Sequence, residues 1–380
     1  MKLIEFEPQE KRYQKGFIEF PFKLYANTPQ WVPPLRIDMK NIFNTKKHAF
    51  YESGTAHFIL AFDDSGQTIG RLAVMESQRY NAYFKTKIAF FYLFEAIDDF
   101  SVVKALFNSG FNWAVEHGLT KMIGPKGFSV MDGFGTLIKG FEYRPAFGQI
   151  YNPPYYPTML EQLGFEKKWD AYTGYMDRTS KIPDKIFQVA ELVQKKRNFN
   201  VIEFKSKAEL RSIVPDVKTL YNKSLADDSR NMPLSDADIQ TMVNQLMKFA
   251  DPKLIKLIYK NDKAIGFLLA FPDISKALQR CNGRLFPLGW IHLLRELKKT
   301  NCVNFNGAGL LEEHRRIGGT ALLYAEIYKS ATSSKNYTYA EMLQVRDNNP
   351  NMMLEWENVG VELRKIHRFY QRKLSLLKNK

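Results

Sequence analysis

Strand-like and helix-like patterns of apolar residues follow one another in a fixed order along the first half of the chain. Residues 2–6 alternate as in a short strand, whereas the apolar positions of 11–25 have helical spacing. Two apolar runs around Asp-Asp-Ser-Gly-Gln predict a β-hairpin. A third strand is predicted at 88–95, followed by a helix at 102–117 that ends at Gly118. With the later elements, the predicted order is β-α-α-β-β-β-α-β-α-β.

The same order begins again in the second half, although the two halves share little direct identity. Its predicted elements are a strand at 201–204, helices at 208–225 and 235–249, a hairpin at 254–271, a strand at 302–307, a helix at 318–331, a strand at 337–343, a short helix at 350–359 and an extended segment at 361–374. A chain of 380 residues is also too long for one core, so we expect two domains. The boundary is expected at 179–200, with a bridging helix at 183–196.

The composition is that of a folded protein with surplus positive charge. Apolar residues make up 45% of the chain and the formal net charge is +15. This charge fits a solvated lysine-rich surface, a phosphate-bearing cofactor or a nucleic acid. Two cysteines without a Cys-x-x-Cys pair, and scattered histidines, predict no metal site. No secretion signal and no bilayer-spanning apolar run are found, so we expect a cytoplasmic protein without a membrane partner.

The clearest chemical signal lies at residues 304–324. A strand ends in small residues, a loop with two arginines follows, and Gly318 and Gly319 open an amphipathic helix. The first N–H groups of a helix lack internal partners, and the helix dipole adds partial positive charge there. Glycine lets a phosphate approach the backbone closely. The pattern favours an anion site, and the alternative is an ordinary helix start beside a solvated basic loop.

This segment resembles motif A of the GNAT acyltransferase superfamily, Gln/Arg-x-x-Gly-x-Gly/Ala. Arg315 matches the first position and Gly318 the first glycine, whereas Thr320 stands where a second Gly or Ala is usual. Residues 349–360 look like a further GNAT element. In the first half, segments such as Phe-Phe-Tyr-Leu-Phe-Glu-Ala-Ile-Asp-Asp are similar to a bacterial GNAT-like family of unassigned substrate.

The resemblance implies an α/β (α+β) fold with two GNAT-like domains in tandem, each a mixed, mostly antiparallel twisted sheet flanked by helices. Residues 1–180 would form a domain without the pyrophosphate loop, 181–200 a bridging helix or linker, and 201–380 a domain with a degenerate acyl-CoA motif. Acetyl-CoA or another acyl-CoA would be the co-substrate. Its pantetheine arm would lie along Leu310 and Leu311, and its pyrophosphate would be held by Arg315, Arg316, Ile317, Gly318, Gly319, Thr320 and Ala321.

The reaction that the resemblance implies is attack of a neutral amine on the thioester. For the general base we single out Glu341, with Glu312 as second choice, although a glutamate in a strand is more often solvated or salt-bridged. GNAT enzymes often protonate the leaving thiolate with a tyrosine, and Trp356 occupies that position. An indole cannot supply this proton. Three alternatives follow: another tyrosine serves, with Tyr370 as one candidate, the thiolate leaves unaided, or the domain is not an N-acetyltransferase.

The first half is expected to lack a cofactor site. Glu95, Asp98 and Asp99 stand where the phosphate loop would be, and carboxylates repel a pyrophosphate. The aromatic residues of 134–156 either shape a substrate pocket or simply pack the loop.

Three functions stay open at this point. The first is an acyl-CoA-dependent N-acyltransferase, most simply an acetyl transferase, that uses the C-terminal domain and a small-molecule amine. The second is a non-catalytic protein that binds acyl-CoA or another ligand. The third is a nucleic-acid-binding or aminoacyl-tRNA-linked protein, which the basic charge favours.

Overall fold

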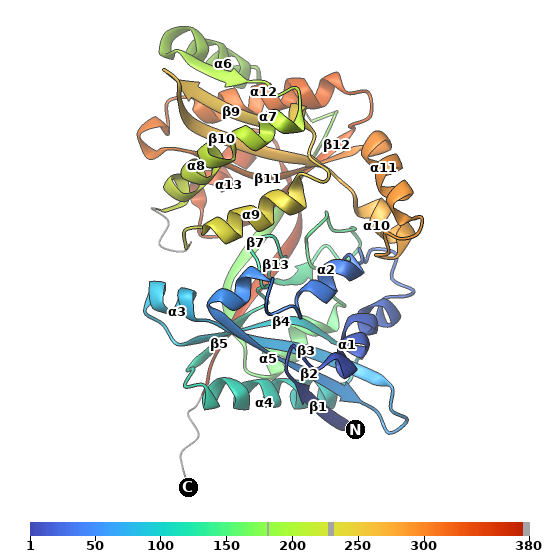
Figure 1. Ribbon diagram of the computed structural model, residues 1–380. Coiled ribbons are helices and arrows are strands. Elements are labelled where there is room, and N and C mark those ends of the chain that lie inside the picture. The colour runs from blue at the N-terminus through green and yellow to red at the C-terminus, as the bar shows by residue number, and fades with distance from the viewer. Residues whose placement is uncertain (181, 227–231, 375–380) are drawn as a thin grey trace.

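A single mixed β-sheet runs through the whole molecule in the computed structural model, which describes residues 1–180, 182–226 and 232–374 (Figure 1). We call residues 1–180 the N-terminal half and 201–374 the C-terminal half. The strand order is β1-β2-β3-β4-β5-β13-β7-β12-β11-β10-β9-β8, and β6 pairs with β13 beside this path. Most neighbours are antiparallel, whereas β4–β5 and β11–β12 are parallel.

The elements of the N-terminal half follow the predicted order, with a helix α3 and a strand β6 added. They are β1 (Lys2–Phe6), α1 (Lys11–Leu24), α2 (Arg36–Asn41), a 3₁₀ turn (Ala49–Glu52), β2 (Gly54–Phe62), β3 (Thr68–Ser77), α3 (Gln78–Phe84), β4 (Ile88–Ala96), α4 (Phe100–Glu116), β5 (Lys121–Gly124), β6 (Thr136–Lys139), α5 (Tyr155–Gln162) and β7 (Glu166–Asp177).

The C-terminal half repeats this order after the linking helix α6 (Asp184–Arg197), with a short helix α7 and a helical pair α10–α11 added. Its elements are β8 (Phe199–Ile202), α7 (Lys207–Ser212), α8 (Val214–Ala226), α9 (Asp236–Leu246), a 3₁₀ turn (Pro252–Leu254), β9 (Ile255–Lys260), β10 (Lys263–Pro272), α10 (Ser275–Cys281), α11 (Gly289–Lys299), β11 (Cys302–Leu310), a 3₁₀ turn (Glu312–His314), α12 (Gly319–Ser333), β12 (Tyr339–Arg346), α13 (Pro350–Asn358) and β13 (Glu362–Lys373).

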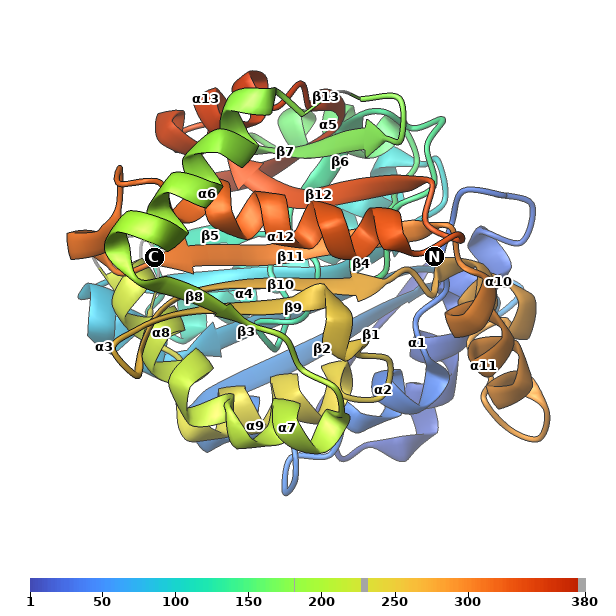
Figure 2. The ribbon, with the colours of Figure 1, turned by 90° about the horizontal axis from the view of Figure 1, so that it is seen from above.

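Helices cover both faces of the sheet because each carries one apolar side. On α4, Val103, Leu106 and Phe107 are fully buried against the sheet, as their helical spacing requires. Asp99 accepts a hydrogen bond from the Ser101 N–H and so caps the start of this helix. From above, α12 lies along the sheet with α6 beside it (Figure 2).

The two halves exchange their last strands. β13, from the end of the chain, lies between β5 and β7 of the N-terminal half, and β7 pairs with β12 of the C-terminal half. In Figure 1 both strands cross the middle of the molecule. Each half would otherwise expose unpaired backbone groups at the edge of β5 or β12, and the partner half's strand satisfies them. The division of the chain near residue 180 therefore stays a prediction, since strands on either side of it share one sheet.

Among the helices that the structure describes, none is long and apolar enough to cross a membrane.

Candidate functional site

Strands β11 and β12 separate at their C-terminal ends. Their parallel ladder runs from Cys302–Tyr339 to Phe305–Met342 and then stops, while β11 continues to Leu310. Asn306 forms a bulge at this point, because Phe305 and Gly307 pair with adjacent residues of β10. A Cβ atom placed on Gly307 would meet no described atom within 4 Å. The separated strands thus leave a gap with free backbone edges.

The gap leads to a turn with unused N–H groups. Arg316 has φ 60° and Gly318 φ 95°, and Gly318 precedes α12 without a side-chain cap. The backbone N–H groups of 316–321 have no acceptor among the described residues, and the first helical bond is donated by Leu322 to Gly318. Six consecutive free donors at the positive end of a helix dipole are chemically suited to bind an anion.

Close packing behind the turn explains why Gly318 is a glycine. A Cβ atom at this position would lie 2.4 Å from a methyl carbon of Val193 and 2.9 Å from one of Val189, both on α6. Its positive φ also disfavours any other residue. Helix α6 therefore supports the turn from behind, and a substitution of Gly318 would disturb the fold before it tested anion binding.

The two arginines of the turn have different surroundings. Arg315 donates to the carbonyl oxygens of Leu310 at 3.2 Å and of Ser224 at 2.6 Å, so it ties the turn to α8. Arg316 is exposed, and the described residues offer it no hydrogen bond or ion pair. Arg316 is thus the cation that can meet a bound anion, while Arg315 holds the backbone in place.

We expect Arg315→Ala to lower the stability of the protein and Arg316→Ala to weaken its binding of coenzyme A. Loss of Arg315 removes two charge-assisted bonds and should lower the free energy of unfolding by about 2 kcal/mol. Loss of Arg316 should leave stability unchanged and weaken coenzyme A binding about 10-fold, because one cation is lost from the phosphate. Urea unfolding and calorimetry measure the two effects. Equal effects of both substitutions would contradict the division of roles.

The backbone of Leu310 and Leu311 is already engaged. The Leu310 carbonyl accepts from Arg315, and the Leu311 N–H donates to Ile265 at 2.9 Å. The free edge of β11 is instead its segment 306–309, beyond the end of the ladder with β12. Only the structure reveals this, because the point of separation depends on pairing with β12 and not on local sequence.

Glu341 lies on β12 in a buried ion pair. Its carboxylate is 2.8 Å from the ammonium of Lys365 on β13, and Lys365 also donates to the Arg144 carbonyl. Burial raises the pKa of Glu341, and Lys365 opposes this rise. The side chain lines none of the cavities described below. Glu312 is exposed in the 3₁₀ turn after β11. Glu341 is therefore held by Lys365, whereas Glu312 is exposed just after β11, and its role as a base stays a prediction.

Glu341→Gln should lower the free energy of unfolding by about 3 kcal/mol, because the buried ammonium of Lys365 loses its counter-charge. The double variant Glu341→Gln/Lys365→Met should recover most of this loss, and Glu312→Gln serves as the exposed control. Urea unfolding measures all three. A stable Glu341→Gln protein without activity would instead support the prediction that Glu341 is the base.

The two aromatic residues weighed for proton transfer lie in cores. Trp356 on α13 is 4% exposed and packs with Met176 and Met342. Tyr370 belongs to β13, which packs into the core of the N-terminal half. There it is fully buried and donates to Glu161 at 3.0 Å. Its distance from the gap follows from the strand exchange, which carries β13 into the other half.

The N-terminal half shows the same separation of strands without the free turn. β4 and β5 pair only from Ile88–Lys121 to Phe90–Ile123, and Leu93 forms a bulge with φ 50°. The start of α4 is occupied by the side chain of Asp99. This half thus has an opened sheet but no comparable row of free N–H groups among its described residues.

A cavity of about 480 Å³ lies between the halves. The sequence did not predict the carboxylates in its wall, because no local motif marks them. α2, β4 and the loop 125–152 line it from one side, and α9 from the other. Its volume falls within the ~300–1,000 Å³ of small-molecule sites. Trp31, Met39, Phe94 and Phe147 give it apolar walls.

Two carboxylates face this cavity without a described ion-pair partner. They are Asp38 on α2 and Asp132 in the loop 125–152. Burial raises the pKa of Asp132 to about 6, with a contribution from Asp38, and burial also raises the pKa of Asp38. The Ser129 N–H donates to Asp132 at 2.9 Å and fixes its orientation. Both side chains are half-buried, and Lys248 in the same wall opposes the rise in the pKa of Asp38. A cationic ligand would stabilise such carboxylates, Asp132 above all.

A buried tyrosine stands beside the polar wall of this cavity. Tyr25 is 3% exposed, and it interacts with Tyr156 and Glu95, which line the cavity. Arg71, also in the wall, pairs with Glu95 at 2.5 Å. The cavity therefore combines polar groups that can bind a ligand with an apolar surface.

The loop 125–152, which lines the cavity, is hydrogen-bonded to β12 beyond the point where β12 separates from β11. Gln344, beyond the last pair of β11 and β12, donates to the Phe134 carbonyl at 3.0 Å. Phe134 is two residues from Asp132. The cavity thus lies near the gap between β11 and β12, and the segment 132–134 connects the two.

Comparison with known proteins gives relatives along the whole chain. Protein YghO of Escherichia coli strain K12 is 28% identical over 369 residues, covering 95% of this chain and 93% of that protein. The bacterial ceramide synthase of Caulobacter vibrioides is 24% identical over 371 residues, covering 95% and 94%. No profile of a known protein family matches the chain.

Solved structures show the same architecture. A tandem GNAT protein from the clavulanic acid biosynthesis pathway superposes with a TM-score of 0.55 at 10% identity, covering 98% of both chains. A probable N-acyltransferase from Enterococcus faecalis V583 gives a TM-score of 0.50 at 8% identity, covering 99% of this chain and 74% of that one. This chain is therefore a protein of the tandem GNAT fold.

Proposed function

We propose that this protein is an acyl-CoA-dependent N-acyltransferase that binds its donor in the C-terminal half and its amine in the cavity between the halves. The observation that carries the proposal is the row of free N–H groups at 316–321, which follows directly on the separated strands. These donors fit a pyrophosphate, and Arg316 adds a full charge. The pantetheine arm would lie along 306–309.

The cavity supplies the features that an amine acceptor needs. Asp38 and Asp132 can bind the ammonium form, and Asp132, with its pKa near 6, can take the proton that the nitrogen must lose before attack. The amine nitrogen then forms a bond to the thioester carbon, and the carbon–sulfur bond breaks. The second proton that the nitrogen loses passes to the thiolate, so that coenzyme A leaves as the thiol. The free N–H groups beside the bulge at Asn306 would stabilise the carbonyl oxygen.

We infer that the transferred group is longer than acetyl and that the amine carries a long apolar chain. An apolar cavity of about 80 Å³ begins at Phe305 and Met342, where the ladder ends, and runs under α12. The larger cavity also has apolar walls. A relative named for ceramide, the amide of a long-chain amine and a fatty acid, supports the same choice.

Release of coenzyme A thiol with a panel of donors and amines tests this function. Palmitoyl-CoA with a long-chain amino alcohol should react faster than acetyl-CoA with ethanolamine. A ligand that binds only the native state raises the melting temperature, so thermal shifts with the same donors report binding without turnover.

The second candidate is a protein that binds acyl-CoA without transferring it. Trp356 in place of a tyrosine favours this candidate, because no phenol stands at that position. A thermal shift with acyl-CoA, together with no thiol release across the panel, would decide for it.

A further inference from the structure

An exposed apolar surface lies on the helical pair that interrupts the C-terminal sheet. α10 and α11 are inserted between β10 and β11, and they protrude at the side of the molecule (Figures 1 and 2). Phe286 is 78% exposed, Leu288 63%, Trp290 45% and Leu294 51%. These are four of the twelve exposed large apolar side chains in the described part of the chain, and they fall within nine residues. Soluble surfaces rarely gather apolar side chains so closely without a partner.

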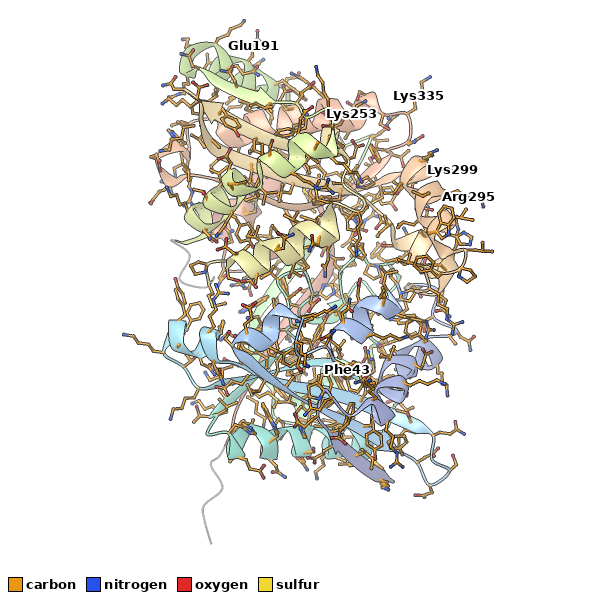
Figure 3. The ribbon with its side chains drawn as sticks, in the orientation of Figure 1. Phe43, Glu191, Lys253, Arg295, Lys299 and Lys335 are labelled. Carbon is orange, nitrogen blue, oxygen red and sulfur yellow. The ribbon has the colours of Figure 1, made fainter. Side chains whose placement is uncertain are left out.

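The same segment carries positive charge, and the described residues 284–299 include no exposed carboxylate. Arg284, Arg295, Lys298 and Lys299 are exposed. The one acidic residue of 275–299, Glu296, is 3% exposed and accepts from Arg280 at 3.1 Å. Figure 3 shows Arg295 and Lys299 at the outer side of the molecule, with Lys335 close by. We call residues 284–299 the basic apolar face.

The helical pair is firmly attached and reaches the cavity between the halves. The Arg36 N–H donates to the Gly283 carbonyl at 3.0 Å, and Gln279 donates to the carbonyl oxygens of Pro29 and Trp31. Leu278 and Trp31 both line the cavity. The surface is therefore a fixed part of the fold that stands next to the proposed amine site.

We propose that the basic apolar face docks this protein on the surface of an anionic lipid bilayer. Trp, Phe and Leu enter the boundary between headgroups and acyl chains, while Lys and Arg extend toward anionic headgroups. Each cation near such a surface adds to the affinity. Nucleic acid would use the charges and can stack on an exposed ring, but it has no need of the exposed aliphatic side chains of Leu288 and Leu294. A bilayer contact needs no spanning helix, so this proposal replaces the expectation of a protein without a membrane partner.

Sedimentation of the full chain with vesicles tests the proposal. Vesicles of phosphatidylglycerol and phosphatidylcholine in equal parts should bind the protein, and vesicles of phosphatidylcholine alone should bind it far more weakly. Arg295→Gln/Lys298→Gln/Lys299→Gln should weaken binding about 100-fold. Phe286→Ser/Trp290→Ser should weaken it at least about 10-fold at unchanged charge.

Matched controls separate this surface from general charge and from misfolding. Lys85→Gln/Lys87→Gln/Lys104→Gln removes three exposed lysines of the N-terminal half and should reduce vesicle binding much less. Indole fluorescence of Trp290 should shift to the blue on binding, and Trp290→Phe should lose that shift while keeping affinity. The proposal is overturned if the apolar double variant binds vesicles like the parent. It is also overturned if that variant only converts a dimer to a monomer, or if RNA binding alone responds to the charge substitutions.

Discussion

Thr320→Glu should abolish coenzyme A binding and leave the protein at least as stable as the parent. Thr320 is in the first turn of α12, within the row of N–H groups that has no acceptor among the described residues. A carboxylate there would use these donors and repel the pyrophosphate, so we expect affinity to fall at least about 100-fold. The same carboxylate interacts favourably with the helix dipole and should add about 0.3–1 kcal/mol of stability.

Thr320→Gln is the matched control, because it has the same shape without the charge. Calorimetry with coenzyme A and urea unfolding of both variants separate binding from folding. Unchanged affinity in Thr320→Glu would remove the turn as the donor site. Gly318→Glu is a poorer test, since its side chain would collide with Val193 on α6.

Asp132→Asn should abolish amine acylation while stabilising the protein at neutral pH. The variant can still accept the Ser129 N–H but cannot take a proton from the amine, and loss of a general base lowers kcat by about 10²–10⁴-fold. Burial raises the pKa of Asp132 to about 6, above the ~3.9 of an unfolded chain, so ionisation opposes folding.

The sign of this effect sets its pH dependence. The penalty is complete above pH ~6 and disappears below pH ~4, where the carboxyl is protonated in both states. Asp132→Asn should therefore be more stable than the parent by up to about 3 kcal/mol at pH 8 and about equal to it at pH 4. Urea unfolding at both values measures this. Asp98→Asn, an exposed change in the same half, should alter neither stability nor activity. An active Asp132→Asn enzyme would refute the assigned role.

Local signals located the turn but not the roles of its residues. Gly318, the arginine pair and the apolar period of α12 are enough to indicate an anion site, because each is a short-range feature of the chain. The separate roles of Arg315 and Arg316 depend on α8, which lies about ninety residues earlier in the chain. The base expected at Glu341 has its partner Lys365 on a strand exchanged with the other half.

The sequence by itself determined most of the order of strands and helices, the duplication of that order and the position of the glycine turn before α12, but not α3, β6, α7, α10 or α11. These follow from short-range periodicity, glycine conformations and helix starts, which neighbouring residues set. The exchange of β7 and β13, the cavity with Asp38 and Asp132, and the exposed face of α11 were decided only by the tertiary structure. They arise because the backbone groups at strand edges and the buried charges pair with residues far along the chain. The local pattern of residues does not specify which distant residue is the partner.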